Sequence, residues 1–158
     1  MLATWIFAAL FMGFLAAAAA GDLRARCIPN ALTGAMAALG PLAVLLAIPA
    51  EGTLVGALLA GAVTLAVSWT MFELGWFGGG DAKLASAAAL WLGGPATVAF
   101  ALATALFGAV LALTVLVLSR RRAAAGPAGT KAPVTVPYAV AMAPAGLVAV
   151  DIRLGGLF

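Results

Sequence analysis

The sequence predicts an all-α membrane protein, a single domain of residues 1–158 that crosses the bilayer about six times. Of the 158 residues, 66% are hydrophobic and only 8% are charged. This composition excludes a soluble domain with a charged surface. The apolar residues also form long uncharged runs, with Gly, Pro or charged residues between them. Because the hydrocarbon core is ~30 Å thick and a spanning helix needs about 20 residues, these runs can be counted as helices.

Six runs meet or approach this length. We expect spans at approximately Leu2–Ala20, Ala31–Ala50, Thr53–Phe72, Ala82–Leu92, Ala96–Ser119 and Val134–Val150. The fourth run is short, because a helix of this length rises only ~16 Å. It must therefore begin inside a polar cavity, tilt little, or extend through Gly93 and Gly94.

Basic residues gather on one side of the predicted membrane. The net charge is +3, and seven of the eight basic residues fall on the same face: Arg24, Arg26, Lys83, Arg120, Arg121, Arg122 and Lys131. Because basic loops are retained on the cytoplasmic side, we expect this face to be cytoplasmic and both termini to lie outside. Residues 120–133 are predicted to be a flexible cytoplasmic loop. The basic charge thus indicates orientation in a lipid bilayer and not binding to nucleic acid.

The four tryptophans lie towards the ends of the predicted spans. They are Trp5, Trp69, Trp76 and Trp91. Indole rings favour the interface between membrane and water. We therefore expect these side chains to form interfacial belts.

Two aspartates mark the ends of predicted spans. Asp22 follows the first run, and Asp81 comes directly after Gly78–Gly80 and before the fourth. A carboxylate near a bilayer needs a water-filled cavity or a partner. Each acid has a structural alternative: Asp22 as a helix-end acid paired with Arg24 or Arg26, and Asp81 as a helix N-cap. Because both lie on the same predicted face at comparable depth, we expect each to be the other's partner.

Paired carboxylates are the groups best suited to acid–base chemistry in this chain. The sequence has no histidine and one cysteine, Cys27, which removes Ser-His and Cys-His nucleophiles and any Cys-x-x-Cys metal site. Two facing carboxylates cannot both ionise easily, so one holds a proton while the other stays anionic. The anion can activate a water that attacks a peptide carbonyl, and the acid can protonate the leaving amine. We expect no metal and no cofactor, and the sequence leaves open which aspartate holds the proton.

Several neighbouring residues are predicted to support the pair. Pro29 can occupy the first turn of the second span and fix its direction, which places the Asn30 amide near the same level. The glycines at 78, 79 and 80 accept backbone angles closed to other residues and let another chain approach closely. Lys83 has two interpretations, one as a group that balances the negative charge or binds a substrate carbonyl, the other as a cytoplasmic anchor.

The combination of Asp22 with Ile28-Pro29-Asn30, followed by Gly78-Gly79-Gly80-Asp81-Ala82-Lys83-Leu84, closely resembles the type IV prepilin peptidases. These are membrane aspartic proteases of the Gly-x-Gly-Asp class, and the resemblance covers nearly the whole chain. It implies that the protein removes the short basic leader from prepilins at the cytoplasmic face, with Asp22 and Asp81 as the catalytic pair. It also implies a substrate with a hydrophobic segment just after the cut.

The chain is similar to the short members of that family. Longer members add a cytoplasmic segment with paired cysteines, and they methylate the new N-terminus using S-adenosylmethionine. This chain has only Cys27 and no such segment. The resemblance therefore implies a peptidase without methyltransferase activity, as in tight-adherence (Flp-type) pilus systems or the archaeal preflagellin peptidases, and more like the former.

Two other classes of protein stay open on the residues alone. One is a proton-coupled carrier in which the aspartates relay protons, and the other is a noncatalytic membrane subunit whose acids pair with Arg24, Arg26 and Lys83. A carrier is expected to show inverted repeats and a site near the midplane of the membrane. The sequence contains no internal repeat, and both acids lie at one face.

Overall fold

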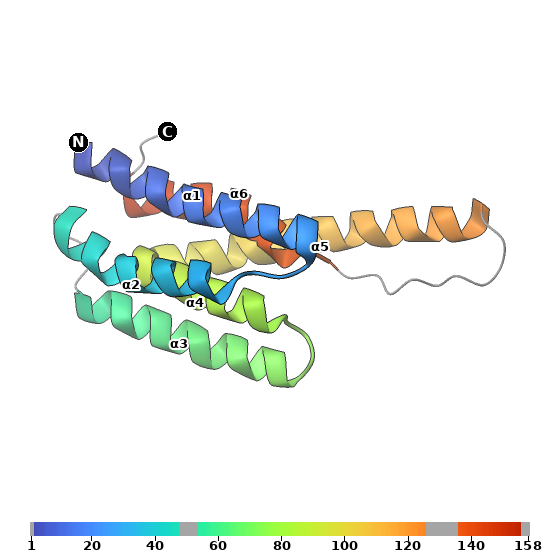
Figure 1. Ribbon diagram of the computed structural model, residues 1–158, viewed down its shortest axis with the longest axis horizontal. Coiled ribbons are helices and arrows are strands. Elements are labelled where there is room, and N and C mark those ends of the chain that lie inside the picture. The colour runs from blue at the N-terminus through green and yellow to red at the C-terminus, as the bar shows by residue number, and fades with distance from the viewer. Residues whose placement is uncertain (1, 48–53, 126–135, 156–158) are drawn as a thin grey trace.

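The computed structural model describes residues 2–47, 54–125 and 136–155, over which the chain forms six α-helices and no strand. The helices are α1 (Leu2–Ala25), α2 (Asn30–Ala47), α3 (Leu54–Glu73), α4 (Gly79–Leu92), α5 (Gly94–Ala125) and α6 (Tyr138–Arg153). The all-helical prediction is confirmed. Figure 1 shows the helices roughly aligned, with the start of α1 and the end of α6 at the same end of the bundle.

The surface of the bundle is that of a membrane protein. Within the part of the chain that the structure describes, three helices are long and apolar enough to cross a membrane, namely α1, α3 and the Gly94–Arg121 part of α5, and α2 is a shorter apolar helix. Large apolar side chains are exposed along α3 and α5: Val55, Leu59, Val63, Val67, Leu102, Leu106, Val110 and Leu113. Soluble proteins rarely expose a continuous apolar surface of this kind. The chain is therefore a polytopic membrane protein.

The short helix α4 lies inside the bundle and contacts each of the other five helices. Nine of its 14 residues are buried, and five of those nine are alanines. Small side chains let helix backbones approach closely where lipid gives no hydrophobic driving force. The helix ends at Leu92 because Gly93 takes a φ of 70°, which favours glycine. The fourth helix therefore does not continue through Gly94, and its short length is accommodated by neighbours on all sides.

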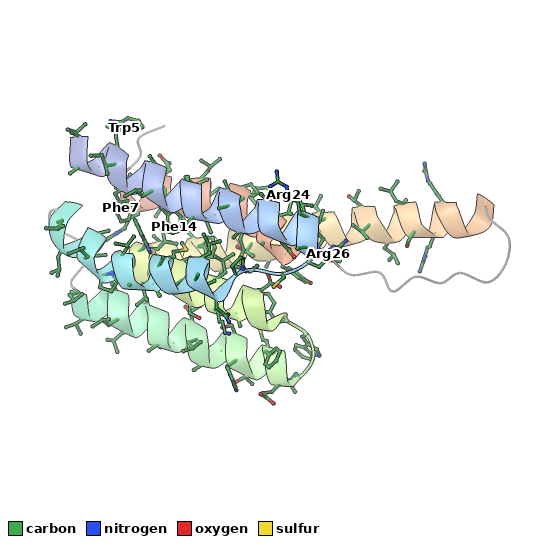
Figure 2. All side chains as sticks on the ribbon, viewed as in Figure 1. Trp5, Phe7, Phe14, Arg24 and Arg26 are labelled. Carbon is green, nitrogen blue, oxygen red and sulfur yellow. The ribbon has the colours of Figure 1, made fainter. Side chains whose placement is uncertain are left out.

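Trp91 belongs to the core, so the prediction that it lies in an interfacial belt is wrong. Its side chain is 0% exposed, and its indole Nε1 donates a hydrogen bond to the carbonyl oxygen of Met36 at 2.7 Å. The ring packs against Phe7, Phe11 and Phe14 of α1 at centroid distances of 5.1, 5.9 and 6.0 Å. In Figure 2, Phe7 and Phe14 extend from α1 towards the interior of the bundle. The sequence places Trp91 near a helix end but does not show that α4 is enclosed.

Trp91→Ala is expected to lower the free energy of unfolding by about 3 kcal/mol, because it leaves a large cavity and removes the buried hydrogen bond to the Met36 carbonyl. The matched control is Trp76→Ala, since Trp76 is 70% exposed. Thermal unfolding of the two purified variants in the same detergent measures the difference. Equal midpoints for both variants would contradict the position of Trp91 in the core.

Helix α5 is longer than the predicted fifth span. We expected Arg120–Ala125 to begin a loop, but these residues belong to α5. Arginine and alanine are strong helix formers, which explains why the helix continues. In Figure 1, α5 extends well beyond the ends of α1 and α4. The remainder of the predicted loop, including Lys131, lies outside the described residues.

Candidate active site

Helices α1 and α4 carry the two aspartates to the same end of the bundle. The helices meet at Phe14 and Trp91, whose ring centroids are 6.0 Å apart. From that contact, Asp22 lies a rise of ~12 Å along α1, and Asp81 lies a rise of ~15 Å back along α4. The connection from α1 to α2 closes this end, because a Cβ added to Gly80 of α4 would lie 3.4 Å from the Cβ of Ile28.

Asp22 is a buried acid in the last turn of α1. Its side chain is only 8% exposed, and its Oδ2 atom is buried with no hydrogen-bond partner among the described residues. Arg24 and Arg26, by contrast, are exposed at the end of the helix (Figure 2). A buried carboxylate oxygen without a hydrogen bond lowers stability. Such a group is more easily explained by a chemical role than by a structural one.

Asp81 is the third residue of α4 and is half-buried. It precedes the apolar run of this helix and lies outside the helices that are long and apolar enough to cross a membrane. Burial raises the pKa of Asp81 to about 7, and the negative charge of Asp22 contributes to the rise. The two carboxyl groups therefore interact, and near neutral pH the pair can hold one proton.

The alternative role of Asp81 as a helix N-cap is wrong. The N-cap of α4 is Gly78, and no side chain caps this end. The helix begins at Gly79, two residues before Asp81, and the Ala82 amide donates to the Gly78 carbonyl oxygen at 2.9 Å. The Asp81 side chain is thus not needed to begin the helix.

The three glycines before Asp81 leave space and do not supply unusual backbone angles. Gly78 has φ −74° and ψ 141°, a conformation that any residue adopts, and none of the three has a positive φ. A Cβ at Gly78 would lie 2.6 Å from Oδ2 of Asp81, and a Cβ at Gly79 would lie 3.2 Å from the Phe72 ring. The groups that lie close to the glycine backbone are therefore the Asp81 carboxylate and the Phe72 ring of α3.

Lys83 and Asn30 are joined to each other. Nζ of Lys83 donates a hydrogen bond to Oδ1 of Asn30 at 3.0 Å, and both side chains are exposed. The carbonyl of Pro29 accepts from the amides of Leu32 and Thr33, so the first turn of α2 begins at the proline as predicted. The bond links the start of α2 to α4 two residues beyond Asp81, a role for Lys83 that neither predicted interpretation included.

Two buried polar residues beyond this bond were missed in the sequence. Thr33 donates to the carbonyl of Asn30 at 3.1 Å, and Ser86 donates to the carbonyl of Ala82 at 2.6 Å. They follow Asn30 and Lys83 by three residues each, which places them on the same helix faces. A helical spacing of three residues, counted from Asn30 and Lys83, would therefore have identified Thr33 and Ser86 in the sequence.

These features define a class: a polytopic helical membrane protein with two interacting carboxyl groups at one end of its bundle. A family model described as the type IV leader peptidase family matches residues 9–113, which include most of α1, all of α2 to α4, the first part of α5 and both aspartates. The chain belongs to this family, and the predicted relation to the type IV prepilin peptidases is confirmed. The protein is therefore a peptidase with prepilin-like precursors as its class of substrate. No curated protein and no solved structure matches the chain.

Proposed function

We propose that Asp22 and Asp81 are the catalytic pair of an aspartic endopeptidase that removes the short basic leader from a Flp-type prepilin. The main support is the buried oxygen of Asp22, which has no hydrogen-bond partner among the described residues, together with the raised pKa of Asp81 beside it. Family membership supports peptide-bond cleavage. The activity that we propose is hydrolysis alone, without methylation of the new N-terminus.

The two acids have different roles in the proposed reaction. Asp81 holds the shared proton, because its pKa is raised to about 7. The Asp22 carboxylate takes a proton from water as the water oxygen attacks the carbonyl carbon, and Asp81 gives its proton to the carbonyl oxygen. When the tetrahedral intermediate collapses, Asp22 protonates the leaving nitrogen and Asp81 recovers its proton from the hydroxyl group. Water is consumed, and both acids return to their starting states.

The position of the basic residues supports cleavage at the cytoplasmic face of the inner membrane. Arg24, Arg26 and Lys83 lie at the same end of the bundle as the aspartates. The C-terminal part of α5, which includes Arg120 and Arg121, extends beyond that end (Figure 1). Basic residues near the ends of spans are retained on the cytoplasmic side. Both termini then lie outside, and the leader of the precursor meets the acids without crossing the bilayer.

The pH dependence of leader cleavage tests this proposal. We expect kcat/KM to fall about tenfold per pH unit above pH 7, because Asp81 loses the proton that it must donate. The sign follows from the raised pKa, since the active protonated form of Asp81 is present below pH 7 and lost above it. Purified protein in lipid vesicles, a prepilin and mass analysis of the product provide the measurement. A rate that climbs steadily from pH 7 to pH 9 contradicts the assignment, and proton uptake without cleavage favours the carrier.

A further inference from the structure

An open groove of about 450 Å³ lies between α2, α3 and α4, outside the pair of aspartates. Lys83 and Asn30 lie among its lining residues, and most of its other walls are small or apolar side chains, including Ala37, Ala62 and Leu90. The groove is therefore an apolar channel with one cationic, hydrogen-bonding end.

The groove begins beside the active site. Its lining positions on α4 run from Lys83 to Leu90, a rise of ~10 Å along the helix. Asp81 lies two residues before Lys83, at the end where Lys83 binds Asn30. The groove therefore runs from the end of the bundle that carries the acids along the helix axes, over about two helical turns.

The protein's own side chains close the floor of the groove but leave its α2 wall open. Leu90 of α4 lies against Gly61 of α3, where a Cβ would collide with it. At Gly34 of α2, in contrast, an added Cβ would meet no atom within 4 Å. A second helix or peptide can therefore approach the backbone of α2 closely, as small residues allow in membranes.

We propose that this groove binds the membrane-embedded apolar segment of the substrate that adjoins the bond to be cut. The inference rests on the proposed function of the aspartates. Continuity with the active site favours this occupant, because a segment seated along α4 reaches Asp81 without a break in the chain. At the cationic end, Lys83 can donate to a substrate carbonyl or carboxylate, while the apolar walls hold the side chains that follow. The groove thus sets which bond reaches the acids.

A photoreactive amino acid at Ala62 provides a direct test, with the same substitution at Val63 as its control. Ala62 lines the groove, whereas its neighbour Val63 is exposed on the outer surface of α3. We expect Ala62, but not Val63, to cross-link to the apolar segment of a full-length prepilin in lipid vesicles. Equal cross-linking at both positions, or cross-linking of Ala62 to lipid alone, overturns the inference.

A kinetic comparison keeps this test separate from the proposed chemistry. Gly34→Leu fills the groove, and Gly13→Leu adds the same side chain to an open position on α1. We expect Gly34→Leu to raise KM for the full-length precursor at least about tenfold with kcat little changed, and Gly13→Leu to leave both unchanged. If KM is unaltered in Gly34→Leu while wild-type protein cleaves normally, the groove assignment fails and the catalytic proposal stands. If wild-type protein does not cleave but Ala62 still cross-links, the catalytic proposal fails instead.

Discussion

Asp22→Asn and Asp81→Asn are each expected to reduce kcat for leader cleavage by about 1,000-fold, within the usual range for loss of an acid or base group. Asparagine has nearly the same shape as aspartate but can neither take a proton from water nor return one to the leaving nitrogen. Since Oδ2 of Asp22 has no hydrogen-bond partner among the described residues, its replacement breaks no bond to that atom. The amount of folded protein in the membrane should therefore be unchanged, and its stability should stay the same or rise.

Glu73→Gln is the matched control for these two variants. Glu73 is an exposed acid at the end of α3, so the change removes the same charge without touching the pair. Single-turnover rates, measured at equal amounts of membrane-inserted protein, compare the three variants. Near-normal cleavage by either aspartate variant contradicts the catalytic assignment. A loss of folded protein with normal activity per molecule indicates that the two acids have a structural role.

Gly78→Ala is expected to reduce kcat by about 100-fold, because a displacement of the order of 1 Å at a catalytic group can have an effect of that size. The new methyl group would lie 2.6 Å from Oδ2 of Asp81 and must push the carboxylate aside. The backbone angles of Gly78 suit alanine, so the helix and the stability of the protein should be little affected.

Gly80→Ala separates this effect from a general effect of losing a glycine. Its Cβ would lie 3.4 Å from the Ile28 side chain, an ordinary contact that leaves the carboxylate in place. We expect activity within about threefold of wild type, with KM unchanged in both variants. If Gly80→Ala is as inactive as Gly78→Ala, the glycines act through helix formation and not through room for Asp81.

The sequence alone was sufficient to predict the helices and the two acids, because both depend on local patterns. Uncharged runs of spanning length mark the helices, and an acid at the end of such a run is conspicuous. The spacing along α1 and α4 then brings Asp22 and Asp81 to one end of the bundle without further information.

The remaining features depend on which helices become neighbours. Trp91 is buried because α1 covers α4, and nothing local to residue 91 indicates this contact. Gly78 leaves room for the Asp81 carboxylate, whereas its sequence context indicated unusual backbone angles and the close approach of another chain. The groove forms only where α2, α3 and α4 come together. From the sequence, only the helical spacing of its lining residues after Asn30 and Lys83 can be recognised.

The most direct test of the interaction between the two acids is an infrared titration of the Asp81 carboxyl group, assigned by subtracting the spectrum of Asp81→Asn. In wild-type protein, we expect its protonated carboxyl band to disappear with a midpoint of about pH 7. In Asp22→Asn the midpoint should move to lower pH, because the repulsion from Asp22 is gone while burial remains. An identical midpoint in both proteins would show that the two carboxyl groups do not interact, and the shared-proton account would then be wrong.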